Sequence, residues 1–187
     1  MVDVDLTVME TANVMEIVIK EMGNHFFFSL KSKNMTRIHL IDRGGIMNEI
    51  LIRQYIEELR YDELYDYVQS LIEHNDADAL CLMGDMYYFN IGVDEDLEKA
   101  IEYYQKAYKQ NNRLAKDRLG EIYYQKAEYI YKYASYLFER EPQDYIKACA
   151  ALKYAYATYK KSADYHYIKA YRSLEMNFIN YSKDDYS

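Results

Sequence analysis

Residues 79–112 read ALCLMGDMYYFNIGVDEDLEKAIEYYQKAYKQNN, and parts of this stretch return at a fixed distance of 36 residues. Five of its positions, Ala79, Met83, Gly84, Tyr87 and Tyr88, recur as Ala115, Leu119, Gly120, Tyr123 and Tyr124. The same spacing of 36 residues relates Tyr67, Gln69 and Asn75 to Tyr103, Gln105 and Asn111. A unit of this length is too short to bury its own apolar face, so neighbouring units must stack around a shared core. The recurrence therefore predicts a repeat protein with a curved binding surface.

Apolar residues on both sides of this stretch follow spacings of three and four, which are typical of helices that bury one face. The stripes predict helices over 46–59, 61–73, 77–89 and 97–109. Gly92 marks the loop before the last of these, and Asp94 or Asp96 can cap that helix by accepting its free N–H groups. One proline and six glycines in 187 residues also favour long helices over an all-β fold.

The quoted stretch resembles the Sel-one-like repeat, a relative of the tetratricopeptide repeat with the pattern A…LG…Y…G.GV..D..KA..YY.KA…GN. The matching positions are Ala79, Met83, Gly84, Tyr87, Gly92, Val93, Asp96, Lys99, Ala100, Tyr103, Tyr104, Lys106 and Ala107. Met83 replaces the usual leucine, and Asn112 stands near the usual closing glycine-asparagine. Neighbouring repeats match in part, over residues 46–181. The resemblance implies an all-α fold, a short right-handed superhelix of about three helix pairs.

The second repeat departs from the family pattern. Glu128 stands where the register places Gly92, and the apolar spacing continues to Phe138. The next helix aligns at an offset of 48 residues, with Asp144 matching Asp96, so twelve residues are inserted as helix. We therefore expect an elongated helical hairpin within 113–161, formed by 113–140 and 142–161, that projects past the repeats. Its tyrosines either cover a two-sided helix or form an interface: Tyr129, Tyr131, Tyr133, Tyr136, Tyr154, Tyr156 and Tyr159.

The N-terminal segment, residues 1–45, is different in kind, and we expect it to cap the repeat domain of residues 46–187. Thr7 and Glu10 form a candidate capping box for a helix that ends near Met22. The alternation of apolar residues at its start is typical of a strand, so both interpretations stay open. Two short runs, 26–30 and 37–41, predict a small β-hairpin. A cap would shield the first repeat's apolar end, and a separate docking element is the alternative.

The net charge of −8 is distributed unevenly. The formal charge is −7 over residues 1–76, −4 over 77–112 and +3 over 113–187. A dipolar molecule of this kind can steer a partner or stack head to tail with itself. The acidic balance disfavours general nucleic-acid binding, which needs a concentrated basic face. RNA binding along the basic C-terminal helices, through tyrosine stacking, is the weakest alternative.

The sequence predicts no enzyme and no cofactor, metal or small-molecule substrate. Its four histidines lack metal-ligand spacing, and neither a phosphate-binding loop nor a Gly-x-Ser-x-Gly elbow occurs. No signal peptide or membrane-spanning stretch is visible. The two cysteines, Cys81 and Cys149, are expected to be reduced thiols. These features predict a cytoplasmic or nuclear protein.

The tetratricopeptide architecture implied by the resemblance lines its concave face with the first helix of each pair. The partner-binding groove would then contain Asp78, Asp85, Tyr88, Phe89, Asp117, Glu121, Tyr124, Gln125, Lys169 and Arg172. Its acids disfavour the carboxylate clamp, which uses basic residues to hold a peptide C-terminus. We expect a non-catalytic adaptor that binds a basic and aromatic protein segment, anchored on Tyr88 and Tyr124. The alternative is a structural subunit of a larger assembly, such as a viral particle, that associates through the tyrosine-rich hairpin.

Overall fold

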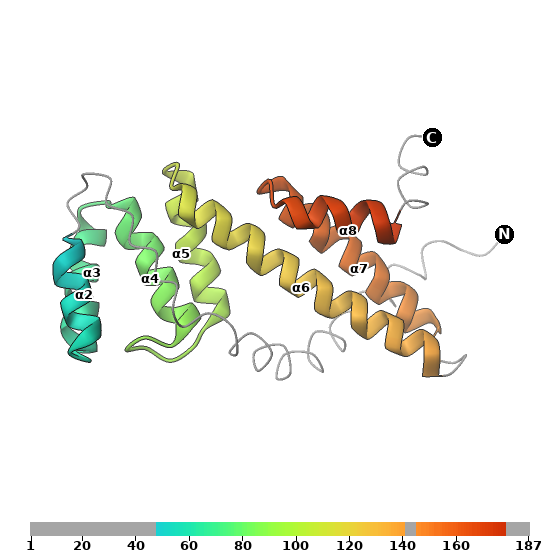
Figure 1. The fold of residues 1–187 in the computed structure, drawn as a ribbon, viewed down its shortest axis with the longest axis horizontal. Coiled ribbons are helices and arrows are strands. Elements are labelled where there is room, and N and C mark those ends of the chain that lie inside the picture. The colour runs from blue at the N-terminus through green and yellow to red at the C-terminus, as the bar shows by residue number, and fades with distance from the viewer. Residues whose placement is uncertain (1–47, 141–144, 179–187) are drawn as a thin grey trace. The chain divides into compact units, whose positions relative to one another are not determined.

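The computed structural model describes residues 48–140 and 145–178, and within these ranges the regular structure is entirely helical (Figure 1). The seven helices of the described chain are α2 (Glu49–Glu57), α3 (Tyr61–Glu73), α4 (Ala77–Phe89), α5 (Leu97–Lys109), α6 (Arg113–Arg140), α7 (Tyr145–Asp164) and α8 (Ile168–Phe178). The all-α prediction is therefore confirmed for these residues. The expected N-terminal cap, with its helix and its β-hairpin, lies outside them.

The described residues fall into two compact units. The first unit comprises residues 48–119, with α2 to α5 and the start of α6. The second unit comprises the described residues from 120 to 178, with the rest of α6, α7 and α8. Each unit has its own core, so the repeat pattern and the inserted hairpin can be considered separately.

Aspartates set the beginnings of both helices in the quoted repeat. The Asp76 carboxylate accepts the backbone N–H groups of Asp78 and Ala79 at 2.8 and 2.9 Å, and α4 follows directly. Asp96 accepts the N–H of Lys99 at 2.9 Å in front of α5. Such caps satisfy N–H groups that have no partner within the helix. Of the two aspartates considered from sequence, Asp96 is the one that caps.

The recurrence of Asn75 as Asn111 has a conformational cause. These residues follow α3 and α5 with φ of 61° and 64°, in the left-handed region that asparagine tolerates better than most residues. Each N–H donates back to a carbonyl of the preceding helix, to Ile72 and to Tyr108, at 2.8 Å. The repeat therefore returns to the same backbone turn every 36 residues.

Helix α4 is the centre of the first unit, because every residue from Ala79 to Met86 is buried. Gly84 lets α5 come close: a Cβ at this position would lie 2.6 Å from Cε1 of Tyr104. Gly120 occupies the same repeat position in the second unit, where a Cβ would lie 3.0 Å from Cβ of Tyr167. The repeat glycine thus permits a close approach in both units, since it lacks a side chain.

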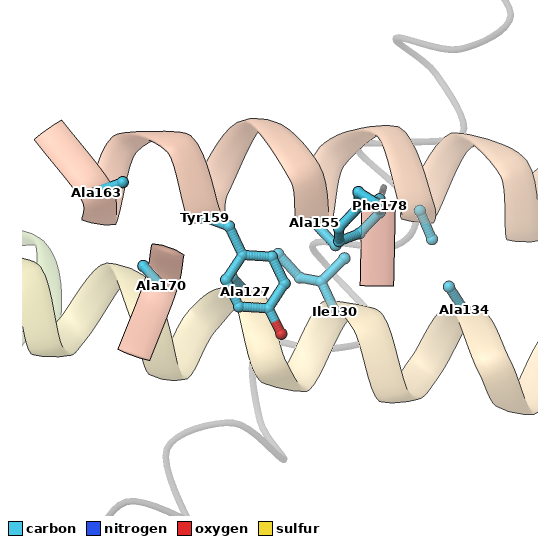
Figure 2. Packing of buried hydrophobic residues seen from close by; sticks show 9 residues of the cluster. Ala127, Ile130, Ala134, Ala155, Tyr159, Ala163, Ala170 and Phe178 are labelled. Carbon is cyan, nitrogen blue, oxygen red and sulfur yellow. The ribbon is translucent and has the colours of Figure 1, made fainter. Parts of the chain in front are cut away.

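The second unit is built on the inserted hairpin. Helix α6 has 28 residues and α7 has 20, against 13 each for α4 and α5, so both helices are lengthened. Small side chains line the seam between them, which lets the helices pack closely (Figure 2). The buried residues of this core are Ala127, Ile130 and Ala134 on α6, Ala151, Ala155, Tyr159 and Ala163 on α7, and Ala170 and Phe178 on α8.

The tyrosines of the hairpin mostly serve this core. Tyr159 is fully buried, and five others are partly buried against the cluster: Tyr129, Tyr131, Tyr133, Tyr154 and Tyr156. Tyr136 is the one of the seven that is largely exposed, at 51%. Covering a two-sided helix therefore accounts for six of the seven side chains, and the aromatic surface left for an interface is smaller than their number suggests.

Candidate protein-binding surface

One of the predicted groove residues, Asp85, lies in the interior of the first unit. Its carboxylate is 2% exposed and accepts the Tyr104 hydroxyl at 2.6 Å. Nε of Arg118 donates to the same Oδ1 at 2.9 Å, and Nη2 donates to Oδ2 at 3.4 Å. Arg118 is itself 8% exposed, with its guanidinium 5.3 Å from the centre of the Phe89 ring. Asp85 therefore joins α4, α5 and α6 and differs from the expected groove-lining acid.

The charges around Asp85 keep its neighbours in their ordinary protonation states. Burial, reinforced by the Asp85 carboxylate, raises the pKa of the Tyr104 phenol and of the Cys81 thiol. Burial alone would lower the pKa of Arg118, but the charge of Asp85, the Tyr104 phenol and the hydrogen bond to Asp85 together outweigh burial, and the pKa is raised. The arginine stays cationic and Cys81 stays a thiol. A protonated, buried thiol is a poor nucleophile.

The other predicted residues of the first unit differ in their access to solvent. Asp78 is half-buried, and its Oδ1 accepts Nδ2 of Asn112 at 2.6 Å. Tyr88 and Phe89 are half-buried at the end of α4 and contact one another edge to face, with ring centres 4.8 Å apart. Asp117 is exposed on α6. A partner could therefore reach Asp117 fully and the two aromatic side chains in part.

In the second unit, Glu121 and Gln125 are half-buried on α6 and joined by a hydrogen bond of 3.2 Å. Tyr124 packs between Tyr159 and Tyr167, with ring centres 5.9 and 5.3 Å away. This packing leaves Tyr124 half-buried beside the core of the second unit. The two basic groove residues on α8, Lys169 and Arg172, are exposed.

The comparison with known protein families concerns the stretch that contains α4 and α5, whose caps and packing are described above. Residues 77–112, which hold α4, α5 and their connections, match the sequence model of the Sel1 repeat. Sel1 repeats are generally non-catalytic modules that bind other proteins. The resemblance found from the sequence is thus confirmed over its best-matching unit.

Among solved structures, the chain is similar to the crystal structure of a Sel1 repeat protein from Oxalobacter formigenes. The two share 18% sequence identity and a TM-score of 0.37, over 70% of this chain and 62% of that one. The chain therefore spans less than two thirds of that protein's length. No curated protein matches it.

The packing of residues 77–112 explains why particular residues occur at the positions that match the Sel1 pattern. Gly84 and Tyr104 are in contact across α4 and α5, and Ala100 and Ala107 are fully buried on α5. Gly92 has a φ of +69°, and a Cβ there would lie 2.6 Å from Cβ of Tyr61, so this position both bends the chain and abuts α3. These pattern residues build the scaffold: Gly84, Ala100, Tyr104 and Ala107 are buried, and Gly92 is exposed in the loop before α5.

Two polar clusters escaped the sequence analysis. Besides the Asp85 cluster, Glu128 in the second unit accepts the Tyr159 hydroxyl at 2.6 Å and the Ser173 hydroxyl at 3.2 Å. The sequence marks Glu128 only as the residue that replaces a glycine. For Asp85 a signal existed: it is the sole charged residue from Ala79 to Met86, a stretch of α4 that is otherwise apolar. Such an acid is expected to be buried with a cation.

The two buried tyrosines that donate to these carboxylates predict a loss of stability in alkali. Burial, reinforced by Asp85 and by Glu128 respectively, raises the pKa of Tyr104 and Tyr159 above the ordinary value of 10.0. Above pH 10 the unfolded chain loses these protons while the folded chain keeps them, so stability is complete below that pH and falls as pH rises. We expect each tyrosine to remove about 1.4 kcal/mol of unfolding free energy per pH unit.

Denaturant unfolding at about pH 9 and about pH 11 measures this loss. The matched control replaces both residues by phenylalanine, which removes the two ionising groups. The control should have a shallower dependence on pH than the parent chain. Equal slopes for parent and control would contradict the assignment.

Two further observations concern membrane-spanning helices and metal sites among the described residues. None of their helices has the length and apolar character needed to cross a bilayer. Across 48–140 and 145–178, no three histidine, cysteine, aspartate or glutamate side chains are grouped as a metal ion would require.

Proposed function

We propose that this chain is a non-catalytic adaptor that binds a basic and aromatic segment of another protein. The observation that carries the proposal is the Sel1 repeat at residues 77–112, a module type that generally binds proteins. The accessible acids on α6 favour a partner segment with basic residues. Asp117 is exposed and Glu121 half-exposed, four residues apart on α6. Residues at this spacing share a helix face, so both can attract the same cationic segment.

The proposed surface differs from the initial groove in how its members contribute. Asp85 supports the surface from within, because its carboxylate is taken up by Tyr104 and Arg118. Tyr88 and Phe89 offer partly exposed aromatic edges beside which a partner's aromatic side chain can pack. The remaining positions of the predicted groove stay a prediction: Asp78 in the first unit, and Tyr124, Gln125, Lys169 and Arg172 in the second.

Selection from a random-peptide library tests the proposal without a known partner. The parent chain is expected to enrich peptides that combine basic and aromatic residues. The Asp117→Lys/Glu121→Lys variant should bind the enriched peptides at least about tenfold more weakly, because it replaces attraction by repulsion. Both positions are accessible, so the variant should fold, and its helical circular dichroism checks this.

A matched control carries the same change in net charge at another place. Glu98 and Glu102 are exposed on α5, also four residues apart. The Glu98→Lys/Glu102→Lys variant should bind the peptides nearly as well as the parent. Equal weakening in both variants would indicate a non-specific charge effect, and the failure of the parent to enrich basic and aromatic peptides would refute the proposed chemistry.

A structural subunit that associates with itself is the second candidate. It is favoured by large apolar side chains exposed where α6 ends and α7 begins: Tyr136, Phe138, Tyr145 and Ile146, with exposed fractions of 51%, 41%, 60% and 65%. The rings of Phe138 and Tyr145 contact one another edge to face with centres 5.5 Å apart, so they form one patch. Exposed aromatic patches of this kind are typical of interfaces.

A further inference from the structure

Helix α8, which packs beside α7 (Figure 1), presents apolar side chains on both of its sides. Ala170 and Phe178 are buried in the core of the second unit, and Leu174 packs against that core. On the opposite side, the side chains of Ile168 and Met176 are 68% and 82% exposed. A helix that buries one face in a core normally has polar residues on the other, so these exposed side chains indicate an interaction surface.

Four neighbouring side chains on the exposed side of α8 form one surface, which we call the outer face: Tyr171, Arg172, Glu175 and Met176. All four are exposed. With 3.6 residues per turn, Arg172 and Glu175 lie at the middle of this face, Tyr171 at one edge and Met176 at the other. The Tyr171 hydroxyl donates to the carbonyl of Ala163 at 2.8 Å, which holds the ring beside the end of α7. The outer face therefore has two opposite charges between two apolar edges.

The charged residues at the middle of the outer face are available to a partner. Among the described residues, Arg172 and Glu175 form neither an ion pair nor a hydrogen bond. A partner that fits this face must offer an acid opposite the arginine and a base opposite the glutamate. A second α8 helix that runs in the opposite direction offers these two charges in that order.

A two-fold axis that passes midway between Ser173 and Leu174 describes this pairing. The axis relates two antiparallel α8 helices, so that Arg172 of each copy lies at the level of Glu175 of the other copy. Each copy then supplies both kinds of charge, and the interface contains two equivalent ion pairs.

The apolar edges complete the same arrangement. In a two-fold antiparallel pair of helices, equal edges meet, so Tyr171 of both copies lies on one side of the ion pairs and Met176 of both copies on the other. These side chains would exclude water from the charges between them, and exclusion of water strengthens the attraction between opposite charges.

Other arrangements of the two helices are disfavoured by the same residues. In a parallel pair, Arg172 would face Arg172 and Glu175 would face Glu175, and like charges repel. An antiparallel pair shifted by one turn would bring Lys169 opposite Glu175, but it would also place the two Arg172 side chains against one another at the axis. The order of charges on α8 thus selects one direction and one register.

We propose that the protein forms a two-fold dimer in which the outer faces of two α8 helices pack antiparallel. The occupant of this face is a second copy of the chain, and the assembly closes at two copies because both contribute the same surface. Each copy contributes a helix of 11 residues, so the interface is small and the dimer should form only as concentration rises. The proposal uses Arg172, a position that stays a prediction for the groove, and neither Asp117 nor Glu121.

Sedimentation equilibrium at about 0.1 M salt and at protein concentrations up to about 1 mM tests the proposal. The average mass of the parent chain should rise from the monomer towards the dimer over this range. The Arg172→Glu and Glu175→Arg variants each bring like charges together at both ion pairs, so each should stay monomeric. Both positions are exposed, and circular dichroism checks that the variants are folded.

Two further samples test the register itself. An equimolar mixture of Arg172→Glu and Glu175→Arg restores opposite charges at both pairs, and it should dimerise like the parent. The double variant Arg172→Glu/Glu175→Arg exchanges the two charges within one chain and should also dimerise. In the register shifted by one turn, the double variant would face glutamate with glutamate and lysine with arginine, so it would stay monomeric.

Matched controls carry the same changes in net charge at other exposed positions. Lys153→Glu on α7 matches Arg172→Glu, and Glu98→Lys on α5 matches Glu175→Arg. Both controls should dimerise like the parent, because neither residue lies on α8. Loss of the dimer in the controls as well would show that net charge, and not the outer face, governs association.

Three other results would overturn the proposal. A parent chain that stays monomeric over the whole range would exclude the dimer. Single variants that associate as strongly as the parent would place the contact elsewhere, for example on the exposed aromatic side chains where α6 ends and α7 begins. Failure of the mixture or of the double variant to dimerise would show that Arg172 does not pair with Glu175. None of these results bears on peptide binding through Asp117 and Glu121, so the two proposals fail separately.

Discussion

Replacement of Arg118 by alanine is expected to lower the unfolding free energy of the first unit by about 3 to 5 kcal/mol. In the parent chain the Asp85 carboxylate is 2% exposed, and the substitution removes its cation while the Tyr104 hydroxyl still donates to it. An ionised carboxylate that is removed from water and loses its cation is strongly destabilising, far beyond the loss of one exposed ion pair. Denaturant unfolding followed by circular dichroism measures the effect.

A double-mutant cycle separates the ion pair from the general cost of changing a buried position. Asp85→Asn keeps an oxygen that can accept from Tyr104, and Arg118→Met keeps most of the side-chain volume. The double variant should lose less stability than the two single variants added together, because neither charge is then left alone. Additive losses, or a loss below about 1 kcal/mol for Arg118→Ala, would show that Asp85 does not depend on the arginine.

Replacement of Tyr159 by alanine should destabilise the second unit by a similar amount, about 3 to 5 kcal/mol. Tyr159 is fully buried at the centre of the core shared by α6, α7 and α8, where its ring also contacts Phe178 at 6.0 Å (Figure 2). Its neighbours in this seam are mainly alanines, which are too short to fill the space that the ring would leave.

The Tyr159→Phe variant is the matched comparison. It keeps the ring and removes the hydroxyl that donates to Glu128 at 2.6 Å, so it should cost about 1 kcal/mol. Ser173 still donates to the same carboxylate. Denaturant unfolding of both variants distinguishes the contribution of the ring from that of the hydrogen bond. Equal losses for the two would mean that the hydroxyl, and not the packing, holds the hairpin together.

The helices of this protein could be predicted from the sequence because their signals are local. The 61–73, 77–89 and 97–109 predictions coincide with α3, α4 and α5, and 113–140 coincides with the full length of α6. Apolar spacing identified the helices and the asparagine turns separate them. Errors occur at ends without a strong signal: the helix predicted over 46–59 begins only after Asn48 and ends at Glu57, and the helix predicted to end at 161 continues to Asp164.

The exposure of the predicted groove residues could not be predicted, because helical register alone selects these residues. Asp78, Asp85 and Asp117 were treated alike, yet the structure makes them half-buried, buried and exposed. A helical register tells which residues share a face but not whether a third helix covers that face. Asp85 can be buried because it pairs with Arg118, which is 33 residues away along the chain.

The sequence by itself thus determined the repeat period, the all-α class of the described residues, the similarity of residues 77–112 to the Sel1 repeat and the long inserted helix. Each of these depends on spacing, turn-forming asparagines and glycines, which act within a few residues of one another. Only the tertiary structure decided which acids are internal and which tyrosines belong to the core. Burial and ion pairing depend on which segments meet in space, and sequence spacing carries no direct record of that.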